Sequence, residues 1–297
     1  MPVVYRLEVA SAAVRELFPP ALTPVYEAVT ALGGIEVLVA GLTLLYWLDG
    51  ERRRGTATVI AYGLVAVAVV LALKAWFALP RPPASVRLVP IDGYGFPSGH
   101  AAAATVVFGG LALEREWPAT RRRIAGVAVV VAAVALSRVV LGVHYLGDVV
   151  AGVGVGLAVL AVTRTVAAGD PARSFAVGTV AAIAVVAVVG VDPRTVSVLG
   201  AAASATLVSR RWRADELPHH QSPAEVATLL VGGTGVVGLL ARVGAPLIRP
   251  VPVAAGLGAL IVAAILRFPA VLSTIRRHGE RLPAADSDRD GTDRRTD

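Results

Sequence analysis

The chain has 297 residues, of which 56% are hydrophobic and only 16% are charged. This composition lies outside the range of soluble globular domains, so we expect an integral membrane protein. Cysteine is absent, which excludes disulfides, thiolate nucleophiles and cysteine metal sites. The net charge of +7 does not indicate nucleic-acid binding, because the arginines form short clusters between apolar segments, where membrane topology accounts for them.

The apolar segments have the length of membrane-crossing helices, and backbone groups in hydrocarbon must be hydrogen-bonded internally. An amphipathic helix is expected over residues 4–18, ended by Pro19 and Pro20. The sequence therefore predicts an all-α fold, a polytopic membrane bundle of about nine spans. These are expected at Val29–Leu48, Thr56–Leu79, Gly99–Leu113, Ile124–Leu141, Leu146–Ala167, Ser174–Val191, Val196–Val208, Val226–Ala241 and Val251–Leu266.

The spans divide the chain into four expected parts. Residues 1–24 form the amphipathic segment, 25–168 the core that holds the motifs described below, and 169–270 a C-terminal transmembrane extension. Residues 271–297 form a basic and then charged tail, which we expect to be disordered because from Pro283 it has no apolar face. Glycines inside the spans, such as Gly152 and Gly156, are expected to let neighbouring helices approach closely.

Arginine clusters indicate the orientation, because basic residues in short loops stay on the cytoplasmic side. With nine spans, one side of the membrane receives Arg52–Arg54, Arg121–Arg123, Arg164 with Arg173, Arg210 with Arg211 and Arg213, and Arg276 with Arg277. The connections 80–98 and 142–145 then face the opposite, extracytoplasmic side. A site built from these connections is expected to work there.

The first unusual polar pair is Lys74, the single lysine of the chain, and Arg81. Residues seven apart share a helical face, so both charges can converge on one anion if the helix continues to Pro82. Either residue alone is explained as well by snorkelling at a membrane edge. Lys74 lies inside the apolar segment, however, and a buried cation without a partner is costly.

The second group is Pro97-Ser98-Gly99-His100, which leads directly into the third span. The backbone N–H groups from Ser98 onward are expected to form an open helix N-terminus, which suits phosphate. Ser98 can also act as the N-cap. The imidazole of His100 would lie beside a bound anion and could donate a proton to a leaving oxygen.

The third group is Ser137-Arg138 with His144 and Asp148. His144 and Asp148 are four apart, so the carboxylate can fix the imidazole tautomer and leave the other nitrogen free to attack phosphorus. A His-Asp pair alone is more often structural or a metal ligand set, but here cations accompany it. Arg138 presents a planar fork of donors suited to phosphate oxygens.

Together these segments resemble the three-part signature of the type 2 phosphatidic acid phosphatase superfamily, which includes the vanadium haloperoxidases. The signature reads Lys, six residues, Arg-Pro; Pro-Ser-Gly-His; and Ser-Arg, five residues, His, three residues, Asp. The resemblance implies that His144 is the nucleophile, Asp148 its orienting partner and His100 the general acid. It further implies phosphate binding by Lys74, Arg81, Ser98, Gly99 and Arg138, with no metal and no cofactor.

The expected function is a lipid phosphate phosphatase of the cell membrane, working through a phosphohistidine on the extracytoplasmic side. Its partners would be the bilayer and a lipid phosphate, such as an isoprenoid carrier diphosphate, phosphatidate or phosphatidylglycerophosphate. A lipid phosphotransferase would use the same motifs, with an alcohol in place of water. A haloperoxidase is disfavoured because its relatives are generally soluble, and a non-catalytic transporter would not require both histidines and the aspartate.

Overall fold

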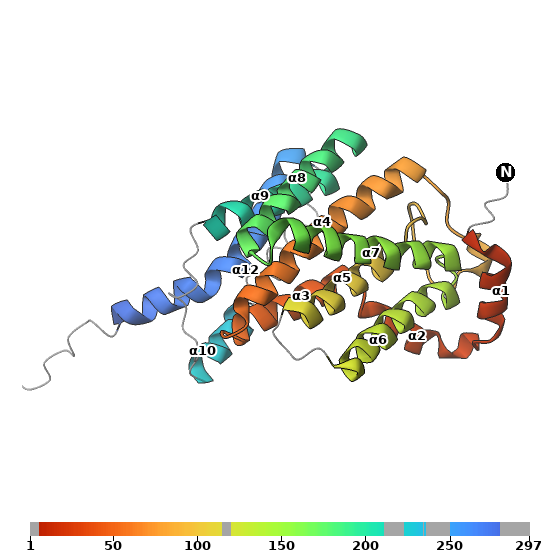
Figure 1. Cartoon of the computed structure of the whole chain (residues 1–297), viewed down its shortest axis with the longest axis horizontal. Helices are drawn as coiled ribbons and strands as arrows, with labels where there is room; N and C mark the ends of the chain where they lie inside the picture. The colour runs from red at the N-terminus through yellow and green to blue at the C-terminus, as the bar shows by residue number, and fades with distance from the viewer. Residues whose placement is uncertain (1–5, 115–119, 211–222, 234, 236–249, 280–297) are drawn as a thin grey trace, which may run out of the picture.

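The computed structural model describes residues 6–114, 120–210, 223–233, 235 and 250–279, and all regular secondary structure in these ranges is helical (Figure 1). The α-helices are α1 (Glu8–Glu16), α2 (Thr23–Ala31), α3 (Ile35–Leu48), α4 (Arg53–Phe77), α5 (Gly99–Glu114), α6 (Arg121–Val140), α7 (Leu146–Ala167), α8 (Pro171–Val189), α9 (Pro193–Arg210), α10 (Pro223–Thr228) and α12 (Val251–Gly279). The prediction of an all-α fold is therefore confirmed for the described residues.

Five of these helices, α4, α6, α7, α8 and α12, are long and apolar enough to cross a membrane. The pair α2 and α3, bent by 44°, would add a sixth span if the two helices cross together. Helix α5 is apolar but has 16 residues, and α9 stands where the seventh span was expected. The expected span at Val226–Ala241 lies partly outside the described residues, so the count of nine stays a prediction.

The first expected span is broken, which contradicts the prediction of a continuous helix over Val29–Leu48. Helix α2 ends at Ala31 and α3 begins at Ile35, with Gly34 in an extended conformation between them. Gly33 packs against neighbouring elements so closely that a Cβ there would lie 2.9 Å from the carbonyl oxygen of His100. The break therefore brings the α2–α3 connection against the start of α5.

Helices α5 and α7 also approach each other closely, and glycines in α7 make this possible. A Cβ on Gly152 would lie 2.5 Å from the carbonyl oxygen of Ser98, and one on Gly156 would lie 2.6 Å from Thr105 Cβ. The expectation that these two glycines serve helix packing is confirmed. As a result, the N-terminal ends of α5 and α7 lie side by side.

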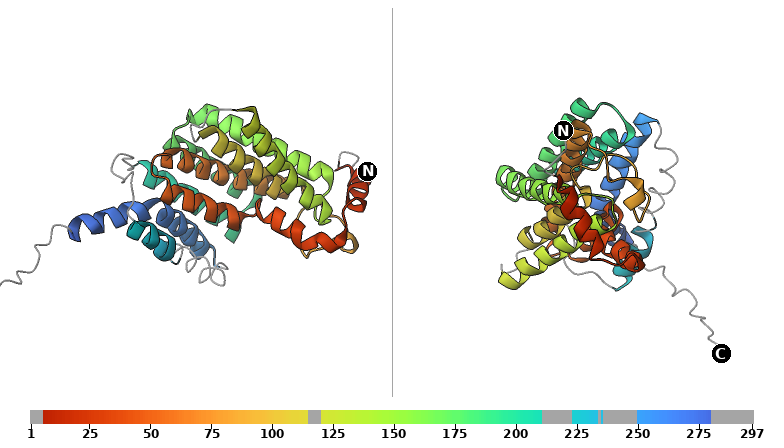
Figure 2. Two further views of the ribbon diagram at one scale, coloured as in Figure 1. Left: turned by 90° about the horizontal axis from the view of Figure 1, so that it is seen from below. Right: turned by 90° about the vertical axis from the view of Figure 1, so that its right-hand side faces the viewer.

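The C-terminal helices α8, α9 and α12 form a second group, which packs on the first mainly through α4 (Figures 1 and 2). Trp47 at the end of α3 is fully buried, and its Nε1 donates to the carbonyl oxygen of Ile265 in α12 at 2.7 Å. Helix α12 continues past Pro269 to Gly279, beyond the expected end at Leu266. The charged tail from residue 280 lies outside the described residues.

Candidate active site

The three motif segments meet at one end of the bundle. They occupy the C-terminal part of α4, the connection 78–98, the start of α5, the end of α6 and the start of α7. Two contacts join them directly. The Ser98 N–H donates to the carbonyl oxygen of Asp148 at 2.9 Å, and Arg81 Nη1 lies 3.1 Å from His144 Nε2. The sequence-predicted residues thus belong to one site, although they come from five parts of the chain.

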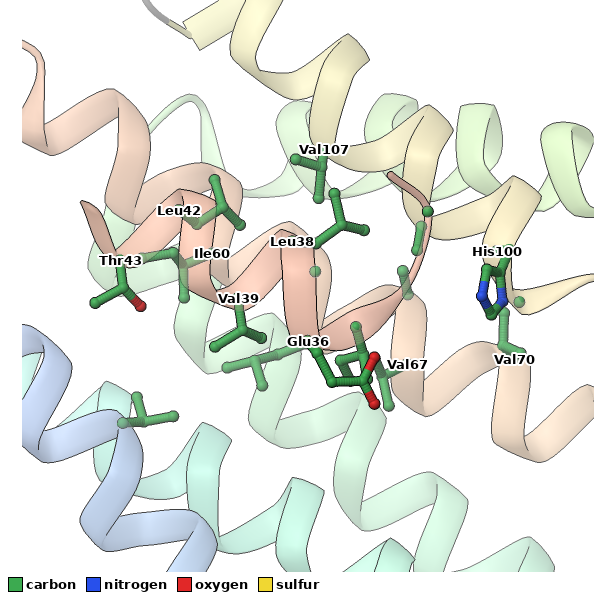
Figure 3. A pocket seen from close by; sticks show the side chains of 18 of the residues that line it. Glu36, Leu38, Val39, Leu42, Thr43, Ile60, Val67, Val70, His100 and Val107 are labelled. Carbon is green, nitrogen blue, oxygen red and sulfur yellow. The ribbon is translucent and has the colours of Figure 1, made fainter. Parts of the chain in front are cut away.

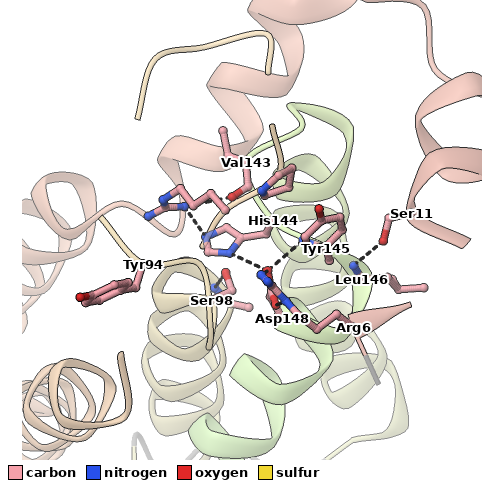
Figure 4. A network of polar contacts seen from close by, with 12 residues as sticks. Arg6, Ser11, Tyr94, Ser98, Val143, His144, Tyr145, Leu146 and Asp148 are labelled. Carbon is pink, nitrogen blue, oxygen red and sulfur yellow. Dashed lines mark hydrogen bonds and ion pairs between the residues drawn. The ribbon is translucent and has the colours of Figure 1, made fainter. Parts of the chain in front are cut away.

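His144 lies at the centre of this site, between a carboxylate and a guanidinium (Figure 4). Its Nδ1 is 3.5 Å from Asp148 Oδ2, at the outer limit of a hydrogen bond, and no shorter partner for this nitrogen exists among the described residues. On the other side of the ring, Nε2 faces Arg81. This arrangement favours the tautomer with the proton on Nδ1, so that Nε2 carries the lone pair.

The imidazole of His144 is only 2% exposed, and this burial lowers its pKa from 6.5 to about 3. Burial is the largest cause of this lowered pKa, the charges of Arg81, Arg138 and Lys74 contribute to it in the same direction, and the contact with Asp148 acts in the opposite direction. Removal from water and nearby positive charge both disfavour the imidazolium. His144 is therefore neutral at neutral pH, as a nucleophilic nitrogen must be.

Asp148 is fully buried and held by a residue that the sequence did not single out, Arg6. The guanidinium of Arg6 donates from Nε to Oδ1 and from Nη2 to Oδ2, both at 2.9 Å. It also lies over the ring of Tyr145, 4.5 Å from the centroid, and donates to the carbonyl oxygen of Pro80 at 2.8 Å. The Tyr145 N–H donates to Asp148 Oδ2 at 2.9 Å. The carboxylate is thus fixed by three donors besides His144.

Ser11 in α1 supports the same helix start, because its hydroxyl accepts a hydrogen bond from the Leu146 N–H at 2.8 Å. The amphipathic N-terminal segment therefore covers the beginning of α7 (Figure 4). Arg6 and Asp148 are 142 residues apart in the chain, so no spacing rule connects them. The only signal in the sequence was an arginine at the start of an amphipathic helix, which fits a membrane surface equally well.

Lys74 and Arg81 converge as expected, but for a different reason. Helix α4 ends at Phe77, and Ala78 has a left-handed conformation with φ 46°, so Arg81 lies in the connection and not on the helical face of Lys74. The condition that the helix continue to Pro82 is therefore not met, and α4 ends two residues before the expected end at Leu79. Both side chains instead donate to the connection 92–94, Lys74 Nζ to the carbonyl oxygen of Tyr94 at 2.7 Å and Arg81 Nε to that of Gly93 at 3.1 Å.

Arg138 is 4% exposed and donates from Nη1 to Thr30 Oγ1 in α2 at 3.0 Å. Its Nε has no hydrogen-bond partner among the described residues. Arg138, Arg81 and Lys74 all lie close enough to His100 and His144 to act on both electrostatically. Three cations therefore surround the two histidines.

The start of α5 departs from expectation at one atom. The Ser98 N–H is bonded to α7 through the carbonyl oxygen of Asp148, so it is not an open donor, and the prediction that it would be was wrong. The Ser98 hydroxyl lies 3.5 Å from the Ala101 N–H, a long N-cap contact. Gly99 and His100 follow in the first turn of α5.

Residues 55–170 match the family model of the PAP2 superfamily, a segment that runs from the start of α4 to the start of α8 and holds all three motifs. This segment belongs to the PAP2 superfamily. Among curated proteins, none matches the chain significantly. Among solved structures, the crystal structure of Aquifex aeolicus LpxE aligns with a TM-score of 0.45 and 22% identity, over 52% of this chain and 91% of that chain.

Three features of the site come from outside the PAP2 segment. Arg6 holds Asp148, Thr30 accepts from Arg138, and Gly33 packs on the backbone of His100. All three precede α4. The N-terminal 34 residues therefore complete a site whose motifs lie in the PAP2 segment.

An apolar groove of about 400 Å³ opens beside the site, lined by α3, α4, α5 and α12. His100 lies at one end of the view of the groove, and Thr43 and Ile60 lie at the other end (Figure 3). The groove therefore leads from His100 of the PAP2 segment along the helices, and Lys74, Gly99 and residues of α12 also line it.

Proposed function

We propose that this protein is a membrane phosphatase that hydrolyses a phosphoester or diphosphate of a lipid through a phosphohistidine intermediate. The observation that carries the proposal is the position of His144, with Nδ1 towards Asp148, Nε2 towards Arg81, and the charges of Arg138 and Lys74 near the ring. Membership of the PAP2 superfamily supports the same reaction class.

In the first step, the lone pair on His144 Nε2 attacks phosphorus and the bond from phosphorus to the leaving oxygen breaks. His100 donates a proton to that oxygen, so the product leaves as an alcohol or a phosphate. The positive charge that develops on the His144 ring is stabilised by Asp148, which is already ionised and held in place by Arg6. In the second step, water attacks phosphorus, His100 takes its proton, and inorganic phosphate leaves His144.

The transferring phosphoryl group spreads negative charge over its equatorial oxygens, and fixed donors aimed at them are the main source of catalysis in such reactions. Lys74, Arg81 and Arg138 supply this charge, and the Ser98 hydroxyl and the Gly99 N–H are the proposed neutral donors. In this proposal no metal takes part.

A lipid substrate is supported by the apolar groove that reaches Lys74 and His100 and by the membrane-crossing character of α4 and α7. The arginine clusters assign the site to the extracytoplasmic face. Phosphate release there would recycle or remodel a lipid whose headgroup is exposed outside the cytoplasm.

The test is inorganic phosphate release by detergent-purified protein from isoprenyl diphosphate, phosphatidate and phosphatidylglycerophosphate, with EDTA present. We expect release from at least one substrate and a loss of about 10³-fold or more in His144→Ala, because no other group replaces the nucleophile. Equal release by the variant would overturn the phosphohistidine mechanism. Loss of substrate without phosphate release, with phosphate appearing on an added alcohol, would identify a phosphotransferase.

A further inference from the structure

The three cations of the site have one property in common, because each of them donates to uncharged oxygens. Lys74 and Arg81 donate to backbone carbonyl oxygens, most of them in the connection 92–94, at distances of 2.7–3.2 Å. Arg138 donates to the hydroxyl oxygen of Thr30 at 3.0 Å. Within the described parts of the chain, none of the three cations forms an ion pair with a carboxylate. These hydrogen bonds therefore fix the cations without cancelling their positive charge.

The carboxylate of the site is bound by a different residue. Asp148 is fully buried, and both of its oxygens accept from the guanidinium of Arg6 at 2.9 Å. Asp148 acts on Lys74 and Arg81 only at longer range. A fourth cation thus takes up the negative charge of Asp148, and the three phosphate-binding candidates remain unpaired with acid.

Thr30 shows this separation most clearly. Arg138 is 4% exposed, so its guanidinium needs an acceptor that the protein supplies. Thr30 lies 108 residues away in the last turn of α2, just before the break to α3, and its hydroxyl oxygen provides that acceptor for Nη1. The Nε of Arg138 has no partner among the described residues. One nitrogen is therefore anchored, while another donor and the whole positive charge are left for an anion.

A carboxylate in place of the Thr30 hydroxyl would anchor Arg138 at least as firmly, because hydrogen bonds between charged groups are the stronger ones. It would also compete with a phosphate for the same guanidinium and repel the phosphate oxygens, an effect that is large where water is excluded. Catalysis of phosphoryl transfer depends on fixed donors whose charge is available when negative charge develops. The uncharged acceptor meets both requirements, anchoring and available charge.

We propose that Thr30 is a positioning residue that holds Arg138 through an uncharged oxygen and so keeps the charge of Arg138 available to the phosphoryl group. The inference rests on the proposed function, because it takes Arg138 as a phosphate-binding residue. It places a determinant of the reaction in α2, outside the PAP2 segment.

The decisive comparison is between Thr30→Asn and Thr30→Asp, which introduce side chains of the same shape that differ in charge. Both side chains offer an acceptor oxygen to Arg138. Ala28→Asp is the matched control, since Ala28 is an exposed residue of the same helix and the substitution adds the same charge. Thr30→Val removes the acceptor and keeps the branched shape. Thermal unfolding of each variant checks the fold.

The experiment measures phosphate release from a substrate that the parent hydrolyses, and its inhibition by inorganic phosphate. Thr30→Asp should lower kcat/KM and raise the inhibition constant for phosphate, each at least about tenfold, because the new carboxylate neutralises Arg138. Thr30→Asn should stay within about threefold of the parent and Ala28→Asp within about twofold, since exposed charges are screened. Thr30→Val should lower kcat at least about fivefold, because a buried donor loses its anchor.

A structural role alone predicts that Thr30→Asp and Thr30→Asn behave alike, since both can anchor Arg138. Equal values for these two variants would therefore overturn the inference, as would equal damage by Ala28→Asp and Thr30→Asp, or full activity of Thr30→Val.

Binding of radiolabelled inorganic phosphate to the His144→Ala protein separates this inference from the proposed function. It is measured by equilibrium dialysis with Thr30, Asn or Asp at position 30. Binding that is weakened only by Asp, with no phosphate release by the parent from any substrate, would support the role of Thr30 and refute the phosphatase. Phosphate release by the parent, with binding that is absent or equal in the three proteins, would do the reverse.

Discussion

At the scale of single residues, the contact between Arg6 and Asp148 has the largest consequence for the chemistry. Both side chains are buried, at 3% and 0% exposed, and the guanidinium binds the carboxylate through two atoms. An ionised carboxylate beside His144 stabilises the imidazolium, and a cation on its other side weakens that effect. Arg6 therefore both fixes Asp148 and limits how strongly it acts on His144.

This position predicts the effect of replacing Arg6. In Arg6→Gln, Asp148 loses the neutralising charge, so the pKa of His144 should rise from the low value set by burial. The His144 ring can be followed by NMR in isotope-labelled protein. In the parent, the ring should stay neutral from pH 8 to pH 5. In the variant, the pKa of the ring should rise towards this range or into it. We also expect kcat to fall at least about tenfold, since the carboxylate is less well held.

Loss of one partner of a buried ion pair costs about 3–5 kcal/mol, so the fold of the variant must be checked by thermal unfolding. Arg6→Lys is the second variant, because it retains the charge without the planar fork. It should keep the pKa of His144 low while still reducing kcat. An unchanged ring titration in Arg6→Gln would show that Arg6 has a structural role only.

At the scale of elements, the close approach of α5 and α7 positions the site. The Ser98 carbonyl oxygen faces Gly152. The Ser98 N–H donates to the carbonyl oxygen of Asp148, which lies one helical turn before Gly152. Because α5 carries His100 and His144 lies two residues before α7, the separation of these helices sets the geometry of the proposed proton donor and nucleophile. A single methyl group between them would change it.

Gly152→Ala would place its Cβ 2.5 Å from that backbone oxygen, so the helices must move apart. We expect kcat for phosphate release to fall at least about tenfold, with a smaller change in KM, because misplacement of reacting groups by about 1 Å can cost about 10²-fold. Gly154→Ala, two residues away with open space around it, is the control and should be neutral or slightly stabilising, as alanine favours helices. Equal activity of the two variants would contradict this account.

The break between α2 and α3 likewise depends on glycines that let neighbouring helices approach closely. The sequence 29–48 is apolar apart from Glu36 and two threonines and reads as one span, yet Gly33 and Gly34 allow the chain to bend where it meets α5 and α6. The bend delivers Thr30 to Arg138. Local hydropathy could not predict it, because the cause is the proximity of helices distant in the chain.

At the scale of the whole molecule, the orientation proposed from the arginine clusters would put the connection 78–98 outside and the connection between α5 and α6 in the cytoplasm. The chain has no cysteine, so single substitutions report accessibility without further engineering. Ser85 and Arg122 are exposed residues in or beside these two connections. In intact cells, Ser85→Cys should react with a membrane-impermeant maleimide, and Arg122→Cys should react only after permeabilisation. The opposite labelling pattern would place the site in the cytoplasm.

The sequence by itself determined the all-α class, the apolar helices from α4 to α8 and the residues of the three motifs, because hydropathy and short spacings are local properties of the chain. Contacts between distant segments were decided only by the tertiary structure. Arg6 reaches Asp148 across 142 residues, Ser98 donates its N–H to α7, and α12 lines a groove that also includes Lys74. Such contacts depend on which helices pack together, and packing is set by small residues and buried polar partners far apart in the chain.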